Sequence, residues 1–350
     1  MIRSLRVLDQ TQCRGDGNDT LVGNADIFAD EADNLNGGNG SDTIYAENTD
    51  IVQGGAGQDF LYVVNSNPFT INLGATSIEW IQSDFGNDTI DGSSQTVGIE
   101  VYSDGGNDII TGSSFNDIIW SGSGNDTVNA GDGNDVIVGD VGADSLSGGA
   151  GDDSIYIDAS DTSIDGGSGF DAAYITGGSG MSIDMAATNF EWVADFVGGD
   201  DIIDASGLST RAEVYAQAGT DVVTGGSGAD FLWGGAGNDS VSGGSGDDVL
   251  VGESGADTLT GDAGIDTLYG NSGNGGDGAQ DTYVFTSGWG TDFVFDFEHG
   301  IDKLDMSALG TNFTDLSITS DGPHAHIAFS GNLISVANAV GLIDQGDFIF

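Results

Sequence analysis

The sequence has very little positive charge and almost no cysteine. Among its 350 residues, five Lys and Arg stand against 57 Asp and Glu, which gives a formal net charge of -52. Because phosphate binding depends on Lys and Arg, this imbalance excludes nucleic acid as an ordinary partner. The single cysteine, Cys13, excludes an intramolecular disulfide framework and a thiolate zinc cage. Oxygen ligands remain as the way to hold a metal.

Long apolar runs are missing as well. No window of about 18 apolar residues occurs, so no transmembrane helix is predicted. The first eighteen residues also lack the apolar core of a secretory signal peptide. A chain with few long apolar side chains and a large charge of one sign is normally disordered, because burial does not offset the entropy of ordering. If this chain folds, something must neutralise its carboxylates.

Aspartates recur with a period of nine residues. The two series are Asp108, Asp117, Asp126, Asp135, Asp144 and Asp153, then Asp221, Asp230, Asp239, Asp248, Asp257 and Asp266. On a helix, a step of nine places successive side chains on opposite faces, and an uninterrupted strand also alternates them. We therefore predict a turn in every repeat, at Gly-rich loops such as GGAGND and GGSGDD.

These loops suit calcium. Glycine permits the positive φ values that aim backbone carbonyls at one point, and aspartate adds a short carboxylate there. Calcium accepts six to eight such hard oxygen ligands in loose geometry. The candidate ligand glycines are Gly122, Gly124, Gly131, Gly133, Gly235, Gly237, Gly244 and Gly246. The aliphatic residues expected to point inward after the loops are Val128, Ile137, Leu146, Ile155, Leu232, Val241, Leu250, Leu259 and Leu268.

The loops resemble the GGxGxDxUx nonapeptides of RTX, or haemolysin-type calcium-binding, proteins. The resemblance implies an all-β fold, a right-handed parallel β-roll or β-helix solenoid with a C-terminal β capping region. It also implies Ca²⁺ between repeats n and n+2, about eight ions or more. The implied pairs are Asp108 with Asp126, Asp117 with Asp135, Asp126 with Asp144, Asp135 with Asp153, Asp221 with Asp239, Asp230 with Asp248, Asp239 with Asp257, and Asp248 with Asp266.

Some loops depart from this pattern. GSSFN precedes Asp117, which puts the Asp117/Asp135 site in doubt, whereas GGSGA before Asp230 fits better. Four isolated loops lack a clear neighbour nine or eighteen residues away, and we expect them to be turns with weak or absent metal. These loops end at Asp19, Asp42, Asp59 and Asp171.

A longer duplication encloses the repeats. The segment around Trp80 resembles the segment around Trp192, 112 residues later, which predicts modules at 37–148 and 149–262. An N-terminal arm with degenerate repeats (1–36) precedes them. Each module has a stretch without Gly-Asp loops, which we expect to continue the solenoid without calcium. The tryptophan pairs Trp80/Trp192 and Trp120/Trp233 form either a ligand-binding face or a stack along the coil, and we favour the stack.

The last segment, 263–350, combines the final repeats with a different pattern. GTDFVFDFEHGIDKLDMS is similar to the segment that closes the roll in serralysin-type proteins. Such a region caps the open edge of a solenoid. The final residues, 347–350, resemble an uncleaved C-terminal signal of type I secretion. The resemblance therefore implies a secreted, extracellular or cell-surface protein.

Signatures of catalysis are missing from the sequence, and we expect no enzyme. Its three histidines, His299, His324 and His326, do not form an HExxH zinc motif, and neither a G-x-S-x-G elbow nor a P-loop occurs. The leading hypothesis is a calcium-dependent structural protein that self-associates at the cell surface or in the extracellular matrix, in an S-layer, filament or biofilm. The alternatives are a carbohydrate-binding accessory module that recognises a cell-surface polysaccharide, and an ice-binding or adhesive solenoid.

The first fourteen residues stand apart by charge. Arg3, Arg6 and Arg14 are three of the five basic residues. The alternating segment SLRVLDQ has two interpretations. It adds as a strand to the edge of another subunit, or it caps its own solenoid.

Overall fold

The computed structural model describes residues 11–13, 15–23, 32–272, 276–339 and 342–350. The chain divides into two compact units, Met1–Asp171 and Ala172–Phe350, and each is described by itself. Arg3, Arg6 and Arg14, on which the two interpretations of the N-terminal arm depend, lie outside the described residues.

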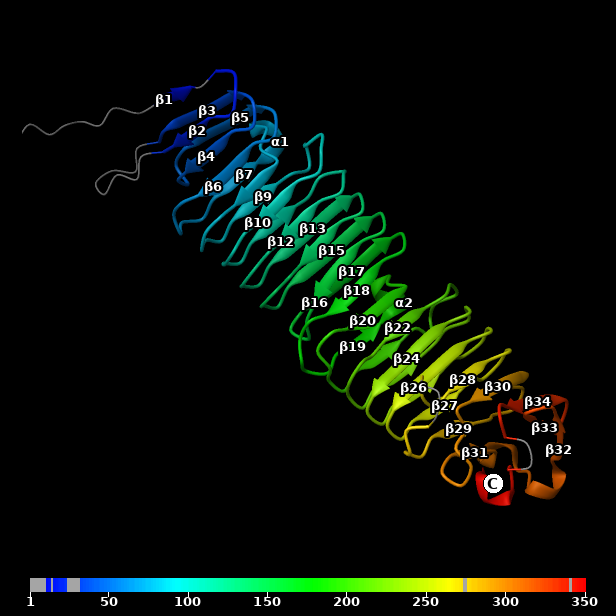
Figure 1. Cartoon of the computed structure of the whole chain (residues 1–350). Coiled ribbons are helices and arrows are strands. Elements are labelled where there is room, and N and C mark those ends of the chain that lie inside the picture. The colour runs from blue at the N-terminus through cyan, green and yellow to red at the C-terminus, as the bar shows by residue number, and fades with distance from the viewer. Residues whose placement is uncertain (1–10, 14, 24–31, 273–275, 340–341) are drawn as a thin grey trace, which may run out of the picture. The chain divides into compact units, whose positions relative to one another are not determined.

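Unit 1 is a parallel β-solenoid in which the chain alternates between sheets (Figure 1). One sheet contains β2 (Thr20–Val22), β4 (Thr43–Ala46), β6 (Phe60–Val63), β8 (Trp80–Gln82), β10 (Glu100–Tyr102), β12 (Ile118–Trp120), β14 (Val136–Val138) and β16 (Ser154–Ile157). A second contains β7 (Thr70–Asn72), β9 (Thr89–Asp91), β11 (Ile109–Thr111), β13 (Thr127–Asp132), β15 (Ser145–Ala150) and β17 (Ser163–Ser168). A third has the order β1 (Thr11–Cys13), β3 (Asn34–Asn39), β5 (Ile51–Ala56).

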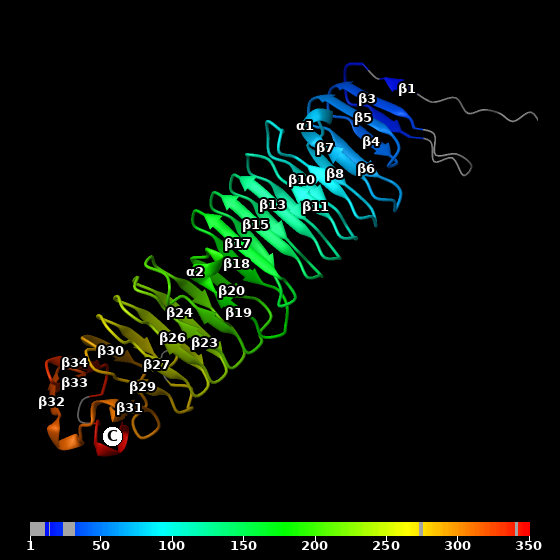
Figure 2. The same cartoon turned by 180° about the vertical axis from the view of Figure 1, so that it is seen from behind.

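Unit 2 repeats this architecture (Figure 2). One sheet contains β18 (Ala172–Ile175), β20 (Trp192–Asp195), β22 (Glu213–Tyr215), β24 (Phe231–Ala236), β26 (Val249–Ser254), β28 (Thr267–Tyr269) and β30 (Thr291–Phe295). The other contains β19 (Ser182–Asp184), β21 (Ile202–Asp204), β23 (Val222–Thr224), β25 (Ser240–Ser242), β27 (Thr258–Thr260), β29 (Thr282–Val284), β31 (Lys303–Asp305) and β35 (Phe348–Ile349).

The parallel pattern ends near the C-terminus. There β32 (Ser317–Asp321), β33 (His324–Phe329) and β34 (Asn332–Val336) pair in antiparallel fashion. β34 also lies parallel to β30, so this segment extends one of the two sheets. Three short 3₁₀ turns complete the region, η1 (Ser307–Leu309), η2 (Phe313–Asp315) and η3 (Gln345–Asp347).

The core is a narrow column of aliphatic side chains from the strand centres. Parallel register places them in rows, for example Ile119 beside Ile137 and Ile137 beside Ile155. All nine aliphatic residues expected to point inward are buried. The all-β parallel solenoid that the RTX resemblance implies is therefore confirmed.

Each stretch without Gly-Asp loops continues the solenoid through a short helix. α1 (Leu73–Thr76) and α2 (Met185–Thr188) lie 112 residues apart. Asn72 and Asp184 cap their N-termini, and the residue that ends each helix has a left-handed backbone. The proposed module boundary at 148/149 differs from the division between the two units and stays a prediction.

The tryptophans stack along the outer side of the coil. In unit 1, ring centroids are 4.9 Å apart for Tyr62–Trp80 and 5.5 Å apart for both Trp80–Tyr102 and Tyr102–Trp120. In unit 2, the corresponding distances are 5.9 Å for Trp192–Tyr215 and 4.7 Å for Tyr215–Trp233. The row of ring contacts along the coil expected from the sequence is confirmed, with most of these pairs tilted and only Tyr215 and Trp233 close to parallel, at 13°.

Candidate metal centre

The candidate ligand glycines adopt the backbone conformation that their role requires. All eight have φ between 89° and 148°, a region that residues with a Cβ rarely adopt. Space is restricted too, because a Cβ at Gly124 would overlap the carbonyl oxygen of Gly106, and one at Gly246 would overlap that of Gly228. Glycine thus lets stacked loops bring their carbonyl oxygens close together.

Backbone hydrogen bonds join the members of every predicted aspartate pair. The N–H of Asp108 donates to Oδ1 of Asp126 at 2.8 Å, and the N–H of Asp126 donates to Oδ1 of Asp144 at the same distance. The six other predicted pairs have the same bond at 2.7–2.9 Å. The structure therefore brings together all eight pairs, and each loop is linked to the loop two repeats away.

The second carboxylate oxygen is the informative one. Over the described part of the chain, Oδ2 is buried and has no hydrogen-bond partner in Asp42, Asp59, Asp108, Asp126, Asp135, Asp144, Asp153, Asp201, Asp221, Asp239, Asp248, Asp257, Asp266 and Asp292. Each of these residues is at most 2% exposed. Buried anionic oxygens without a partner are strongly unfavourable, so this row of oxygens is suited to binding cations.

Carbonyl oxygens lie beside these carboxylates. A Cβ built on Gly243 would overlap both Oδ2 of Asp248 and the carbonyl oxygen of Gly261, from the next loop in the stack. Gly148 has the same relation to Asp153 and Gly166. No group of three or more His, Cys, Asp or Glu residues able to hold a metal is found among the described residues. The neighbouring carbonyl oxygens are therefore available to complete a coordination shell, which suits calcium.

Burial raises the pKa of the ladder carboxyls. The pKa of Asp126 rises from 3.8 to about 6, and those of Asp135, Asp248 and Asp257 rise to about 7. Desolvation is the largest cause, backbone N–H donors oppose it, and neighbouring aspartates add to it. A bound divalent cation would favour the ionised forms.

Asp117 and Asp230 differ from the rest of the two series. Oδ2 of Asp117 accepts from the N–H of Ser113 at 2.5 Å, and Oδ2 of Asp230 accepts from the N–H of Gly226 at 2.7 Å. The sequence favoured Asp230 over Asp117 as a calcium ligand, and this preference stays a prediction. Both carboxylates are satisfied by their own loops.

The ladder extends beyond the regular repeats. The backbone N–H groups of Asp19, Asp42 and Asp153 donate to Oδ1 of Asp42, Asp59 and Asp171, respectively, each at 2.8 Å. The N–H of Asp59 donates to Oε2 of Glu79. The expectation that no neighbour lies nine or eighteen residues away is therefore wrong for Asp171, whereas Asp19, Asp42 and Asp59 have ladder neighbours at other separations. The separation is 18 residues for Asp153 and Asp171, whereas loops of unequal length change it to 23 and 17 for the other two aspartate pairs.

Sequence reasoning missed further ladder members. They include Asp33, Asp50, Asp88, Asp201, Asp281, Asp292 and Asp302, each joined to a ladder neighbour by the same kind of bond. A signal was present, because each lies two residues before a buried strand residue, as in Asp292-Phe293-Val294. A search for this spacing without a fixed period would have found them.

Comparison with known proteins identifies the family. The model of the RTX calcium-binding nonapeptide repeat matches residues 29–61, 73–95, 102–137, 130–161, 138–173, 215–250 and 251–274, together more than half of the chain. The chain belongs to the RTX repeat family. A search of curated proteins finds no match.

Similar solved structures cover parts of the RTX chain. The AlgE6R2 and AlgE6R3 subunits of the Azotobacter vinelandii mannuronan C5-epimerase are 26% and 24% identical. They align with 37% and 35% of this chain and 91% and 80% of their own, with TM-scores of 0.29 and 0.27. The extracellular lipase LipA of Serratia marcescens is 17% identical over 76% of this chain and 45% of its own, with a TM-score of 0.22.

Family and geometry together make this a calcium-binding β-solenoid. The repeats that the family model matches contain most of the buried aspartates, and their partnerless oxygens fit a hard divalent cation. In the described part of the chain, no helix is long and apolar enough to cross a membrane.

Proposed function

We propose that this RTX chain is a secreted structural protein that folds when it binds calcium and then assembles at the cell surface or in the extracellular matrix. The observation that carries the proposal is the row of buried, partnerless Oδ2 atoms that accompanies the core of both units. Each strand buries only one or two apolar side chains, so burial alone does not outweigh the repulsion among carboxylates. Calcium supplies the difference.

The proposed sites follow the aspartate ladder. Six of the eight predicted pairs have a free Oδ2 on both members, namely Asp108/Asp126, Asp126/Asp144, Asp135/Asp153, Asp221/Asp239, Asp239/Asp257 and Asp248/Asp266. Pairs that include Asp117 or Asp230 have one carboxylate already satisfied, and we expect weaker binding there. About eight ions or more remain the expected number, because the extended ladder adds candidate pairs.

Export by a type I route agrees with the partial burial of the C-terminal residues in the folded unit. β35 pairs with β31, and Asp347 is fully buried against His299 at 3.0 Å. Because Asp347 and Phe348 are buried while Ile349 and Phe350 stay exposed, a signal at 347–350 would be fully accessible only before unit 2 folds. Low cytosolic calcium keeps the chain unfolded during export, and calcium outside the cell then drives folding.

Assembly is the function class that the remaining features favour. The described residues are repetitive and acidic, and their carboxylates are taken up by the ladder rather than by an isolated catalytic pair. We therefore propose that the chain has no enzymatic activity. A quasi-one-dimensional repeat protein offers extended, regular surfaces, which suit lattices and filaments.

A carbohydrate-binding role is the second candidate, because aromatic rings line the outside of the coil. Trp120 is 43% exposed at one end of the unit 1 stack. The hydroxyl of Tyr102 donates to Glu100 at 2.6 Å beside that stack. Binding of a neutral polysaccharide, abolished by Trp120→Ala, would favour this candidate, and a glycan array without a signal would count against it.

The test of the leading proposal compares calcium with a chelator. We expect circular dichroism to report a largely disordered chain in chelator and a β-rich chain at about millimolar calcium. Sedimentation in calcium should then detect species larger than one chain. Equal β content in both conditions would contradict calcium-driven folding, and a folded chain that stays monomeric at high concentration would contradict assembly.

A further inference from the structure

Buried serines replace glycine in one stack of loops in unit 1. Ser83, Ser103 and Ser121 each stand five residues before a ladder aspartate, where the loop GGAGND has Gly234. The hydroxyl of Ser103 donates to the carbonyl oxygen of Ser121 at 2.7 Å, and the hydroxyl of Ser121 donates to that of Gly139 at 3.2 Å. The hydroxyl of Ser83 donates to the carbonyl oxygen of Ser103 at 3.4 Å. Ser83, Ser103 and Ser121, here called the hydroxyl row, thus join successive loops.

The hydroxyl row lies beside the proposed calcium ligands without using them up. Burial raises the pKa of Asp108 and Asp126 to about 6. The hydroxyls of Ser103 and Ser121 oppose this rise, as backbone N–H groups do, so each hydroxyl lies next to the carboxylate of its own loop. A carbonyl oxygen has two lone pairs, and the bond from a serine leaves one of them for calcium. The row can therefore hold the loops together both with and without the ion.

In the turn between β9 and β10, Gln95 donates into a cluster of oxygens. Its buried amide nitrogen, Nε2, lies 2.7 Å from the carbonyl oxygen of Ile78, 3.3 Å from that of Leu73 and 3.4 Å from Oε1 of Glu79. Two carbonyls and a carboxylate are oxygens of the kind that calcium binds. The other oxygen of Glu79 accepts from the N–H of Asp59, so both carboxylate oxygens have partners within the protein. This part of the ladder is closed without a cation.

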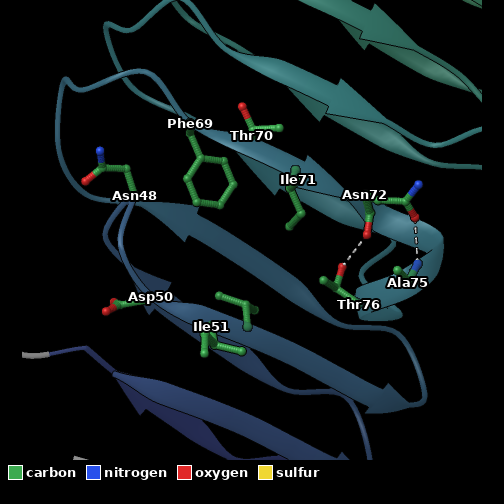
Figure 3. Close-up of a pocket in the computed structure, with 10 residues that line it drawn as sticks. Asn48, Asp50, Ile51, Phe69, Thr70, Ile71, Asn72, Ala75 and Thr76 are labelled. Atoms are coloured by element: carbon green, nitrogen blue, oxygen red, sulfur yellow. Dashed lines mark hydrogen bonds between the residues drawn. The ribbon is translucent and has the colours of Figure 1, made fainter. Parts of the chain in front are cut away.

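The helix α1 positions the carbonyl of Leu73 for this amide. The side chain of Asn72 holds the start of the helix by accepting from the N–H of Ala75 at 2.7 Å (Figure 3). Gln53 on β5 donates to the carbonyl oxygen of Thr76 at 3.1 Å. The helix thereby bridges the break between the sheet that ends at β5 and the sheet that begins at β7. Side-chain donors of the protein thus connect the coils of this region on both sides.

The corresponding coils of unit 2 have other residues at these positions. When β8, β10 and β12 are aligned with β20, β22 and β24, the hydroxyl row is replaced by Asp195, Ala216 and Gly234, and the glutamine by Leu208. An ionised aspartate, an alanine, a glycine and a leucine offer no side-chain donor. Burial raises the pKa of Asp201, and the charge of the fully buried Asp195 raises it further. These coils therefore have fewer donors and one more buried negative charge to neutralise.

We propose that the coils containing β8, β10 and β12 close at a lower calcium concentration than the coils containing β20, β22 and β24, so that the duplicated regions fold in order as calcium rises. This order rests on the calcium-driven folding proposed above. A hydrogen bond within the protein favours the folded coil by a factor of about two to ten, and here the gain persists when calcium binds. Because several ions share the gain, we expect the calcium midpoints of the two regions to differ by about threefold.

Hydrogen exchange of the full chain, measured by mass spectrometry during a calcium titration, tests the order. The titration runs from chelator to about millimolar calcium, and peptides from 98–126 and 211–239 report on the two regions. We expect 98–126 to become protected first. In the double variant Ser103→Ala/Ser121→Ala, two bonds between loops are lost, so the midpoint of 98–126 should rise about twofold while that of 211–239 stays unchanged. Ala216 is buried at the position that corresponds to Ser103, so an alanine fits in such a loop.

Two matched variants accompany the double variant. Ser147→Ala removes a hydroxyl from the outward side of β15, and both midpoints should stay unchanged. Ala216→Ser introduces into unit 2 the donor that Ser103 provides in unit 1, and the midpoint of 211–239 should fall. This second variant tests the proposal even if Ser103→Ala/Ser121→Ala does not fold.

Three outcomes would overturn the inference. Equal midpoints in the unmodified chain, or earlier protection of 211–239, would refute the order. A difference in midpoint that neither the double variant nor Ala216→Ser changes would refute the hydroxyl row as its cause. Each of these results leaves calcium-driven folding intact. Protection of both regions in chelator would contradict calcium-driven folding itself, so a failure of the proposed function is distinguishable from a failure of the order.

Discussion

At the scale of single residues, the Asn-Asp dipeptide links the loops in both directions. Oδ1 of Asn107 accepts from the N–H of Asn125 at 2.8 Å, while the N–H of Asp108 donates to Oδ1 of Asp126 at 2.8 Å. The asparagine bonds are exposed and the aspartate bonds are buried. The two bonds join the same pair of loops with opposite donor directions, and only the buried oxygen on the aspartate side is left for a cation.

Replacing Asp126 separates its function as a hydrogen-bond acceptor from its proposed function as a calcium ligand. In Asp126→Asn the amide oxygen can still accept from Asp108, but the charge and the free anionic oxygen are lost. We expect the two proposed sites that share Asp126 to weaken, with a loss of about 1–3 kcal/mol of stability in calcium. Titration calorimetry and thermal unfolding in calcium measure both effects.

Asp117→Asn is the matched control for this substitution. Ser113 donates its N–H to Oδ2 of Asp117 and its hydroxyl to Oδ1, at 2.8 Å for the hydroxyl. Asp117 therefore has less capacity left for calcium, and its replacement should change calcium stoichiometry less than Asp126→Asn. An equal loss of bound ions in the two variants would contradict the importance assigned to the free Oδ2.

At the scale of strands and loops, the sequence predicted the regularly spaced strands and missed the elements that interrupt the nine-residue period. Alternation and a fixed period were enough to place the buried residue of each regular strand, such as Leu146 and Leu250. Asp292 was hidden because a 26-residue separation from Asp266 breaks the period. α1 and α2 were hidden because four residues cannot display helical periodicity. The break between β5 and β7 depends on strand pairing, which no local pattern encodes.

The turns should tolerate a side chain only where the loops are not stacked. Gly124→Ala introduces a Cβ at φ 138°, where it overlaps the carbonyl oxygen of Gly106. We expect a loss of about 1–3 kcal/mol, measured by denaturant unfolding at saturating calcium. Gly178→Ala is the control, because nothing lies within 4 Å of its added Cβ and its φ is not in the left-handed region. Equal destabilisation by the two substitutions would argue against close loop stacking.

At the scale of the whole molecule, the problem is a net charge of -52. Calcium is one way to neutralise the buried carboxylates, and protons are another. Burial raises the pKa of Asp221 and Asp281 from 3.8 to about 7, and that of Asp292 to about 8. In the unfolded chain the same groups titrate near 3.8. The calcium-free fold therefore binds protons more tightly than the unfolded chain does.

This difference predicts that acid partly substitutes for calcium. A group whose pKa is raised in the folded state stabilises that state fully below its unfolded pKa, and the contribution disappears as pH rises through the folded value. In calcium-depleted buffer, we therefore expect β content to increase as pH falls from about 8 to about 5, through the folded-state pKa values.

In calcium the dependence reverses, because protons compete for the same oxygens and calcium affinity should fall over this range. Circular dichroism with and without calcium at each pH measures both trends. Sedimentation at the acid end is needed to exclude precipitation near the isoelectric point of about 4.1. A calcium-free chain that loses β content on acidification would refute the assignment of these buried carboxyls as the barrier to folding.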